Sequence, residues 1–598
     1  MQNQYTNLDT IKFFVHQVHQ TEKVLGSGRF EAYDSASVDM FLDSIKTLSD
    51  TELFPYIKEM DEKPSFYKDG AITIHPQFEK IFQQAKDLGL VATIFNEADG
   101  GLQMPNTLFH AAYYIMEAAN NHVTGYLGLT AGSANLIATF GSQALKDIYL
   151  SKMLDMEWTG TMCLTEPQAG SSLSDITTSA TPTTDGSYKI NGQKIFISSG
   201  DHQFASNIIH LVLARVDGAP QGTKGVSLFV VPKHKVDKQG NQGETQVIVA
   251  GEFEKLGQRG YCTSHLAFED SEGWLVGEEN QGLIYMFQMM NEARVATGRM
   301  GAGIASAAYY ASLQYAKERP QGRKLTTTGD KDLAQEQTLI INHPDVKRML
   351  LHQKSIVEGS LSLVLQASHY LDCEHLAEGE EKERYNLLLE LLTPIVKTYP
   401  SEKGLESVSQ GLQVLGGYGF CTDFILQQYY RDIRIISIYE GTTGIQSLDL
   451  LGRKVSLKSG KVLEWLGEEI QDTIKTSTAY NDLAPFAKTL GESLMLVQQV
   501  LGQLMPIAKK GDYERFLSDA TIFMDFFGTI VIGWQWLKIA NSAKKSLEDG
   551  LHDKSLLEGK IHTMKFFYKY EMSRTKGLAK TIVDDLKLTL DVDLNYFD

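Results

Sequence analysis

The hydrophobic periodicity of this 598-residue chain changes twice, and this limits the fold more than any other feature. Up to about residue 160, apolar side chains recur every three or four positions, which predicts helices. From 160 to 282 the pattern favours short strands, and from 283 onward the helical spacing returns. The chain is therefore expected to fold as an α+β protein, with a small β domain between helical parts.

A polar break at 456–461 separates a last helical stretch from the rest. We therefore expect four domains, an N-terminal helical domain at 1–159, a middle β domain at 160–282, a helical bundle at 283–455 and an additional helical domain at 461–598. Helical spacing is clearest at 38–53, 76–90, 107–120, 283–319, 343–369, 383–415 and 443–455. Segment 188–197, with Asn191-Gly192 at its centre, is typical of a β-hairpin. Further strands are expected at 207–216, 226–232 and 264–268.

Composition excludes several classes of protein. Lys and Arg number 56 against 74 Asp and Glu, a net charge of −18, so phosphate backbones repel the chain and no nucleic-acid partner is expected. Its four cysteines are far apart and form no CxxC pair, which favours a reducing compartment and indicates no metal site. The N-terminus lacks the features of a targeting peptide. The apolar stretch 522–537 is shorter than the roughly 20 residues that a bilayer requires. We expect a cytoplasmic protein without a membrane span.

The first informative motif is the segment Met162–Ser172, at the transition from helices to strands. Pro167 and Gly170 favour an irregular backbone, whose N–H and C=O groups need partners outside a ladder. Thr165 and Ser171 add hydroxyl groups. This chemistry suits the polar edge of a heterocycle or a phosphate, although an ordinary loop has the same composition.

A second motif, GLQVLGGYGF at 411–420, places three glycines directly after a helical pattern. Such glycines allow a ligand to approach the backbone closely, and they also simply terminate helices. The motif is not the GxGxxG dinucleotide fingerprint, and the sequence contains no P-loop.

The third motif ends in IYEGTTGIQ at 438–446, where Glu440 ends an apolar run and precedes a glycine and an expected helix N-terminus. A carboxylate in this place is commonly a helix-capping acid. In a pocket poor in water its pKa would instead rise toward that of a useful general base. The residues alone leave both interpretations open.

Together, these motifs resemble those of the acyl-CoA dehydrogenase family over about residues 35–455. The matching segments are CLTEPQAGS (163–171), KIFISSG (194–200), KLGQRGYCT (255–263), the MNEAR-to-YAKERPQG run (290–322), GLQVLGGYGF (411–420) and IYEGTTGIQ (438–446). They occur in the family's order and at its spacing. The C-terminal extension is similar to that of the larger bacterial branch, which includes the methylmercaptopropionyl-CoA dehydrogenase type.

The resemblance implies a β-barrel-like middle domain, a four-helix bundle and FAD bound between them. It implies that the cofactor is contacted by Met162, Leu164, Thr165, Ser171, Phe196, Ser198, Arg319, Gln413, Gly416, Gly417 and Thr442. Arg319 and the 411–420 segment would serve the FAD of a second subunit, which implies a homodimer. Ser172, Ser198 and Gly444 depart from the residues that the family usually has at these places.

The resemblance also implies the chemistry. Glu440 would remove the α-proton of an acyl-CoA while the β-hydride passes to FAD, giving a trans-2-enoyl-CoA. Electrons would then pass to an electron-transferring flavoprotein, and the reaction would belong to fatty acid β-oxidation. The substrate would be contacted by Ser171, Asn291, Arg294, Tyr439 and Gly441.

Two alternatives share parts of this pattern. An acyl-CoA oxidase has the same core and a helical extension, but it discharges to oxygen and is commonly peroxisomal. This chain ends in Leu-Asn-Tyr-Phe-Asp, unlike a peroxisomal address. A non-catalytic DNA-associated relative would need a basic C-terminal domain, whereas basic and acidic pairs alternate here. A structural role for the extension is favoured, covering a surface that smaller relatives bury in a tetramer.

Substrate chain length has one possible signal. Gly125, Gly128 and Gly132 share one face of the expected helix. They are consistent with close helix packing, or with an open floor in the acyl pocket that this helix lines in the family. The second interpretation favours medium-to-long acyl chains.

Overall fold

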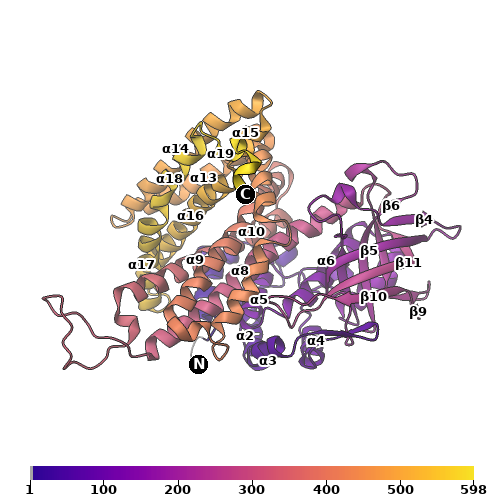
Figure 1. Ribbon diagram of the computed structural model, residues 1–598, viewed down its shortest axis with the longest axis horizontal. Helices are drawn as coiled ribbons and strands as arrows, with labels where there is room; N and C mark the ends of the chain where they lie inside the picture. Colours follow the sequence, from indigo (N-terminus) through magenta and orange to yellow (C-terminus); the bar gives the residue numbers. More distant parts are fainter. Residues whose placement is uncertain (1–3) are drawn as a thin grey trace. The chain divides into compact units, whose positions relative to one another are not determined.

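The computed structural model describes residues 4–598, which divide into two compact units (Figure 1). One unit comprises residues 40–293. The other joins the residues up to Asp39 with 294–598. Helix α8 (Gly282–Glu318) contains the boundary between them. The described residues before Asp39 therefore belong with the C-terminal helices, and the division into four domains stays a prediction.

The 40–293 unit begins with helices and continues as a sheet. Helix α2 (Ser35–Leu48) enters this unit, and the helices that follow are α3 (Ile57–Glu62), α4 (Gln77–Asp87), α5 (Asn106–Ala119), α6 (Thr124–Phe140) and α7 (Gln143–Leu154). The strands are β1 (Phe66–Lys68), β2 (Ala71–Thr73), β3 (Trp158–Cys163), β4 (Ser179–Pro182), β5 (Tyr188–Ser198), β6 (Asn207–Val216), β7 (Ser227–Pro232), β8 (His234–Val236), β9 (Gln242–Thr245), β10 (Val247–Glu252) and β11 (Thr263–Leu275).

Seven of these strands form one sheet, six of them in the order β10-β11-β5-β4-β6-β3 and the seventh, β7, off this path. Strand β7 pairs with both β6 and β11, so the strands β11, β5, β4, β6 and β7 close a ring. Strand β3 runs parallel to β6, from Trp158 opposite Asn207 to Cys163 opposite Val212. Closure removes free sheet edges, and the predicted β-barrel-like fold is confirmed.

The predicted hairpin at 188–197 is wrong, because this segment is part of the single strand β5. Asn191 and Gly192 mark an irregularity in its pairing with β11, where the register shifts between Phe268 and Ser271. Gly192 has φ +151, and a Cβ there would lie 2.5 Å from the Thr178 hydroxyl oxygen. The glycine therefore permits a close approach of two chain segments rather than a reversal.

The second unit is helical. Its N-terminal helix is α1 (Leu8–Phe13), and after α8 come α9 (Pro344–Leu376), α10 (Gly379–Leu415), α11 (Leu426–Ile433) and α12 (Thr443–Gly452). The C-terminal helices are α13 (Lys461–Ser477), α14 (Ala484–Lys509), α15 (Tyr513–Leu517), α16 (Ala520–Glu548), α17 (Lys554–Tyr570), α18 (Thr575–Val583) and α19 (Leu588–Asp591). The long predicted helices after residue 283 are confirmed in type and approximate extent.

Helices α8 and α10 approach each other through small residues. A Cβ at Gly298 would lie 1.9 Å from the Val396 carbonyl oxygen, and one at Gly301 would lie 3.0 Å from the Pro400 carbonyl oxygen. Pro400 has no N–H, so the Val396 carbonyl lacks its usual helical donor. The two backbones therefore pack directly against each other at this crossing.

Helix α16 is longer than the apolar stretch expected at 522–537. Its 29 residues are long and apolar enough to cross a membrane, with a mean hydropathy of 1.3 in the best window. However, 83% of that window is buried inside the protein. The helix packs against α9, α12, α13 and α17, which accounts for its apolar composition.

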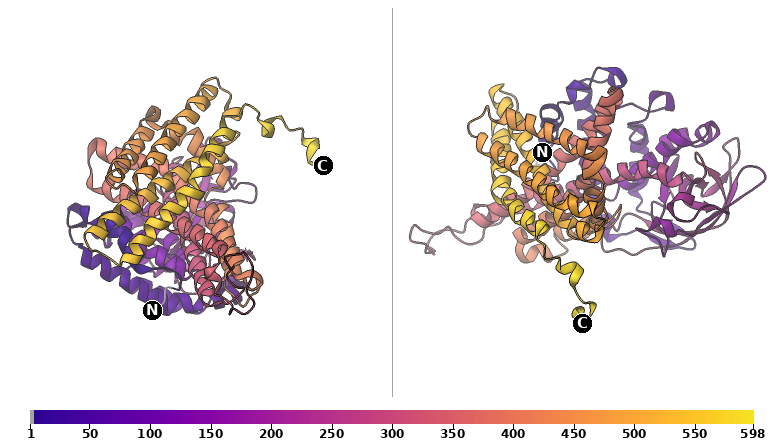
Figure 2. Two further views of the ribbon diagram at one scale, coloured as in Figure 1. Left: turned by 90° about the vertical axis from the view of Figure 1, so that its left-hand side faces the viewer. Right: turned by 90° about the horizontal axis from the view of Figure 1, so that it is seen from above.

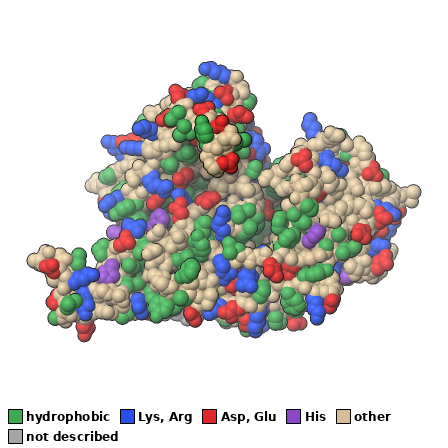
Figure 3. Space-filling view, in the orientation of Figure 1, with side chains coloured by type: hydrophobic (Ala, Val, Ile, Leu, Met, Phe, Trp, Pro, Cys, Tyr) green, Lys and Arg blue, Asp and Glu red, His purple; other side chains and the backbone are tan. Residues whose placement is uncertain are grey.

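The surface mixes charges of both signs. On the face shown in Figure 3, basic and acidic side chains are interspersed among the described residues rather than gathered by sign. The C-terminal end of the chain extends away from the helices of its own unit (Figure 2). The segment between α8 and α9 also extends outward (Figure 1) and exposes Leu325 and Leu333.

Candidate active site

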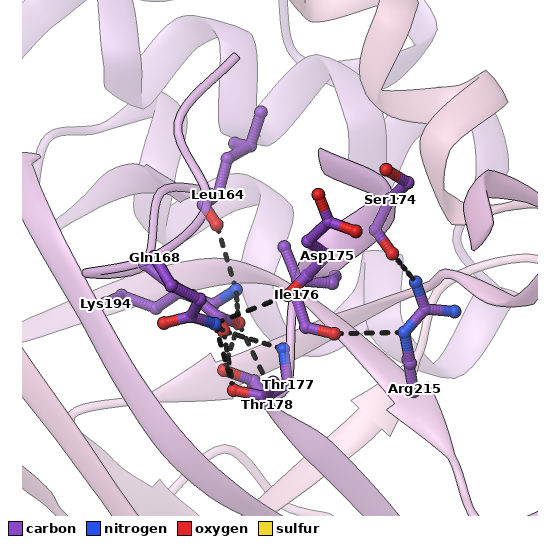
Figure 4. A network of polar contacts seen from close by, with 10 residues as sticks. Leu164, Gln168, Ser174, Asp175, Ile176, Thr177, Thr178, Lys194 and Arg215 are labelled. Carbon is purple, nitrogen blue, oxygen red and sulfur yellow. Dashed lines mark hydrogen bonds and ion pairs between the residues drawn. The ribbon is translucent and has the colours of Figure 1, made fainter. Parts of the chain in front are cut away.

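The loop after β3 is shaped by a buried ion pair between Glu166 and Lys194. Their side chains are 2% and 0% exposed, and Lys194 Nζ lies 2.8 Å from Glu166 Oε1. The same ammonium donates to the Leu164 carbonyl oxygen at 3.0 Å (Figure 4). Glu166 also accepts hydrogen bonds from the backbone N–H and hydroxyl groups of Thr177 and Thr178. These bonds and Lys194 lower the pKa of Glu166 to about 2 against the effect of burial.

This network fixes the conformation of segment 162–171. Gln168 donates to Glu166 from the loop itself, and the Ile195 N–H donates to the Thr165 carbonyl oxygen. Arg215 holds the far end of the loop through the carbonyl oxygen of Ile176 at 3.0 Å (Figure 4). An irregular loop tied at this many points presents its remaining polar groups in fixed positions.

Those remaining groups include three hydroxyls. Within the described residues, the side chains of Thr165, Ser171 and Ser198 make no hydrogen bond. Phe196, on the same strand as Ser198, is 56% exposed and has φ 57, an uncommon conformation for a bulky residue. Met162 is half-buried at the end of β3. The unit thus presents hydroxyls without protein partners, and that of Ser198 lies two residues from the exposed Phe196 on the same strand.

Glu440 lies in the other unit, in the turn between α11 and α12. Its φ is 55, so a non-glycine residue is held in the left-handed region, a strain typical of functional sites. Its carbonyl oxygen accepts from Gln446 Nε2 at 3.2 Å. Within the described residues, neither its backbone N–H nor its carboxylate has a hydrogen-bond partner. Both groups therefore remain available to a ligand.

The surroundings of this carboxylate combine burial with positive charge. Burial raises the pKa of Glu440, while the charges of Arg294 and Lys397 act in the opposite direction. Arg294 is buried on α8, and its guanidinium lies 3.9 Å from Asp449 on α12. The carboxyl is thus poised by opposing influences, as a general base requires.

The neighbours of Glu440 shape the turn. Gly441 has φ +84, and a Cβ there would lie 2.5 Å from the amide nitrogen of Gln446. The Thr442 hydroxyl accepts from Ile445 N–H at 3.3 Å and caps α12. The half-buried Tyr439 places its hydroxyl 3.5 Å from the sulfur of Met300. Asn291 is half-buried on α8, three residues before Arg294, so both belong to one face of that helix.

Arg319 and the glycine-rich segment meet at one place in the second unit. Helix α10 ends at Leu415, and Gly416 follows with φ +61, a conformation that residues with side chains rarely adopt. The guanidinium of Arg319 lies over the Tyr418 ring, 5.5 Å from its centroid. Gln413, Gly416 and Gly417 are exposed there. Four residues proposed for one ligand are therefore brought to one surface.

The three glycines of α6 do not share one role. A Cβ at Gly125 would lie 2.3 Å from the Tyr261 hydroxyl, and one at Gly132 would lie 2.8 Å from the Met289 methyl group. At Gly128 it would meet nothing within 4 Å. At Gly125 and Gly132 the interpretation as close packing therefore holds, because Tyr261 and Met289 fill the space beside them. Open space remains at Gly128 alone.

The sequence interpretation gave no role to three charged residues near these sites. Glu166 and Lys194 lie inside quoted motifs, but only the fold shows that they pair. Lys397 lies in the mostly apolar segment LLTPIVKTYP at 391–400. A single charge in such a segment was the sequence signal that could have marked this residue. Among residues 4–598, no cluster of three or more His, Cys, Asp or Glu side chains is arranged to hold a metal ion.

Family models cover nearly the whole chain. Those for the acyl-CoA dehydrogenase N-terminal, middle and C-terminal domains match residues 35–157, 161–271 and 280–455. A model described as acetyl-CoA dehydrogenase C-terminal like matches 466–593. The chain belongs to the acyl-CoA dehydrogenase family. It is therefore a flavoprotein oxidoreductase that uses FAD to introduce a double bond into an acyl-CoA.

Curated relatives are similar in sequence to this chain along most of their length. The chain is 36% identical to 3-methylmercaptopropionyl-CoA dehydrogenase of Ruegeria pomeroyi over 526 residues, 88% of each protein. It is 32% identical to a broad-specificity linear acyl-CoA dehydrogenase of Mycobacterium tuberculosis over 98% of this chain and 99% of the relative. The predicted resemblance to the larger branch is confirmed, and the oxidase alternative is not favoured.

Solved structures support the fold of this acyl-CoA dehydrogenase. The structure of Caenorhabditis elegans ACDH-11 in complex with C11-CoA matches with a TM-score of 0.75 at 18% identity, over 98% of this chain and 96% of that one. An acyl-CoA dehydrogenase complexed with FAD from Bacillus anthracis matches with a TM-score of 0.73 at 21% identity, over 93% and 90%.

The residues of this acyl-CoA dehydrogenase fit the cofactor chemically. A flavin offers a flat apolar ring with a polar edge, and Phe196 with the unpaired hydroxyls of Thr165 and Ser198 matches both features. Arg319 supplies a fixed cation of the kind that binds phosphate groups.

Proposed function

We propose that Glu440 is the catalytic base of this acyl-CoA dehydrogenase. The observation that carries the proposal is the unpaired carboxylate of Glu440, held in a strained turn beside Arg294 and Lys397. A carboxylate without hydrogen bonds to the protein is free to accept the α-proton of a thioester. Its raised pKa increases its basicity at neutral pH.

The backbone N–H of Glu440 has a complementary role. The α-proton of a thioester is weakly acidic and becomes removable when donors stabilise the developing charge on the carbonyl oxygen. This N–H has no partner within the described chain, and it belongs to the same residue as the base. We propose that it donates to that oxygen, so that one turn supplies both the donor and the proton acceptor.

FAD, when bound, accepts the hydride that leaves Cβ. The Glu440 carboxylate takes the proton from Cα. The substrate therefore loses one proton and one hydride, that is two electrons in all, and the product is a trans-2-enoyl-CoA. We propose that Met162, Leu164, Thr165, Phe196 and Ser198 hold the ring. Ser171 would contact both cofactor and substrate, and Thr442 would lie toward the cofactor.

Substrate contacts and partners complete the proposal. Asn291, Arg294, Tyr439 and Gly441 would hold the thioester near the base. Electrons would pass to an electron-transferring flavoprotein in fatty acid β-oxidation. A cytoplasmic location is supported by the four cysteines, all of which are free of disulfides.

We further propose a homodimer with one FAD per chain. Phe420 is 92% exposed beside the surface formed by Gln413, Gly416, Gly417 and Arg319. The outward segment between α8 and α9 adds Leu325 and Leu333, at 66% and 78% exposure. Large apolar side chains that are exposed in this way are typical of an interface.

The acyl chain is proposed to be of medium-to-long length. Only Gly128 supports this, since a side chain there would enter open space. A slot of this kind rewards each added methylene with about 0.8 kcal/mol.

The test is anaerobic reduction of the purified holoenzyme by saturated acyl-CoAs from butyryl- to palmitoyl-CoA. We expect the flavin absorbance to bleach, with trans-2-enoyl-CoA as product. A parallel assay compares an electron-transferring flavoprotein with oxygen as acceptor. Failure to bleach with every acyl-CoA would contradict the dehydrogenase proposal, and hydrogen peroxide release at the full turnover rate would indicate an oxidase instead.

A further inference from the structure

Lys397 is a buried cation without a partner. Among the described residues, three lysine side chains have no exposed surface, namely Lys194, Lys397 and Lys560. Lys194 pairs with Glu166 at 2.8 Å and Lys560 with Glu358 at 2.7 Å. Lys397 Nζ is the exception, since it is buried and makes no hydrogen bond within the described residues. A buried unpaired ammonium is costly, which indicates that its position serves something other than stability.

The helix crossing brings Lys397 toward the proposed base. Lys397 lies on α10 between Pro394 and Pro400, next to Val396, whose carbonyl oxygen packs against Gly298 of α8. A Cβ at Gly298 would also lie 3.3 Å from the Cα of Lys397. Arg294 is one helical turn before Gly298 and therefore lies on the same face of α8. Both cations thus belong to one crossing.

The turn that carries Glu440 packs on the same crossing. A Cβ at Gly301 would lie 3.3 Å from a methyl group of Ile436, four residues before Glu440. The Thr443 hydroxyl donates to Glu402 of α10, which ties the start of α12 to the helix of Lys397.

Four charged groups act on one another here. Glu440 and Glu402 attract the Lys397 ammonium and Arg294 repels it, while burial lowers the pKa of Lys397 to about 8. Glu402 already accepts from Thr443, and Arg294 is 3.9 Å from Asp449. Glu440 is the acid of this group whose carboxylate has no hydrogen bond within the described chain.

We propose that Lys397 is a positioning residue for the proposed base, and that its buried ammonium keeps the Glu440 carboxylate ionised in the resting enzyme. The inference rests on the proposed role of Glu440. Without the ammonium, burial would favour the neutral acid, which cannot accept a proton. Lys397 does not take part in proton transfer. It raises the fraction of enzyme molecules in which the Glu440 carboxylate is ionised and can accept a proton.

The test is the pH dependence of anaerobic flavin reduction in Lys397→Met and Lys397→Arg holoenzymes. A nearby opposite charge lowers a carboxyl pKa by about 1–3 units. In Lys397→Met the acidic limb of the rate profile should therefore move up by at least about one pH unit, with the plateau rate retained. Lys397→Arg, which keeps the charge, should restore most of the shift. Lys454→Met removes another buried lysine, paired with Glu390 at 2.8 Å, and should leave the limb in place.

A second readout does not depend on turnover. At acidic pH, where the wild-type carboxyl is protonated, infrared difference spectra of wild type against Glu440→Gln assign the band of a protonated Glu440 carboxyl. We expect this band to be absent at neutral pH in the resting wild type and present in Lys397→Met.

The outcomes separate the two proposals. A protonated Glu440 in the resting wild type at neutral pH, or an unmoved limb in a folded, FAD-bound Lys397→Met, overturns the role of Lys397. If Glu440→Gln reduces the flavin normally, the proposed base itself is wrong.

Discussion

Replacing Glu166 by Gln should destabilise the loop after β3 (162–171) without removing any group proposed to touch the cofactor. The substitution keeps the shape of the side chain but leaves the Lys194 ammonium buried without its counter-charge. It also weakens the bonds from Thr177 and Thr178, which require a strong acceptor. We expect a local loss of stability in the segment from β3 to β5.

The magnitude follows from two independent routes. Removing one partner of a buried ion pair typically costs about 3–5 kcal/mol. The pKa of Glu166 falls from 4.5 to about 2, which corresponds to about 3 kcal/mol at 1.36 kcal/mol per unit. Burial lowers the pKa of Lys194 even beside Glu166. The cost of burying the ammonium thus offsets part of the stabilisation by the ion pair, and we use about 3 kcal/mol, the lower end of the range. The contribution is complete above a pH of about 4.5 and is lost as the pH falls toward 2, because the folded-state pKa is depressed.

Hydrogen exchange provides the assay, since it reports local opening without assuming two-state unfolding. Peptides from 158–198 should exchange about 100-fold faster in Glu166→Gln, the ratio that about 3 kcal/mol gives. The matched control is Glu244→Gln, which breaks an exposed pair with Lys235 at 2.6 Å and should leave the exchange of these peptides nearly unchanged. The reasoning is refuted if both variants exchange alike over 158–198.

Two further predictions concern substrate and assembly. Gly128→Leu should lower kcat/KM by about fourfold for each methylene it excludes and shift the preference to shorter acyl chains. A wild-type optimum at butyryl-CoA that the substitution leaves unchanged would show that Gly128 is a packing residue only. Arg319→Ala removes the contact with Tyr418 and should lower FAD occupancy and weaken the dimer in light scattering. A stable wild-type monomer with full FAD would exclude the shared site.

Hydrophobic periodicity correctly predicted those helices and strands in which buried apolar side chains recur at regular spacing. Strand β6 occupies the predicted 207–216, because most of its side chains are buried and apolar. Helices α8 and α10 likewise follow their long helical patterns, and α10 continues through Pro394 and Pro400. The prolines did not end this helix, because neighbouring helices bury it on several sides.

Features that depend on partners distant in sequence were beyond prediction from the residues alone. Asn191-Gly192 has the composition of a tight turn, but pairing with β11 and the approach of Thr178 keep the strand extended. Gly125 and Gly132 could not be told from Gly128 without knowing that Tyr261 and Met289 fill the space beside them. The isolation of Lys397 likewise becomes visible only when α8 and α10 are packed.

The most direct test of the central claim is anaerobic flavin reduction in Glu440→Gln. The substitution keeps the size of the side chain and removes its basicity. The matched control is Glu292→Gln, because burial raises the pKa of Glu292 to about 7 and makes it another candidate base on chemical grounds. We expect Glu440→Gln to bind FAD and acyl-CoA yet fail to bleach, while Glu292→Gln bleaches at nearly the wild-type rate. Bleaching of Glu440→Gln at the wild-type rate, with loss in Glu292→Gln, would contradict the account.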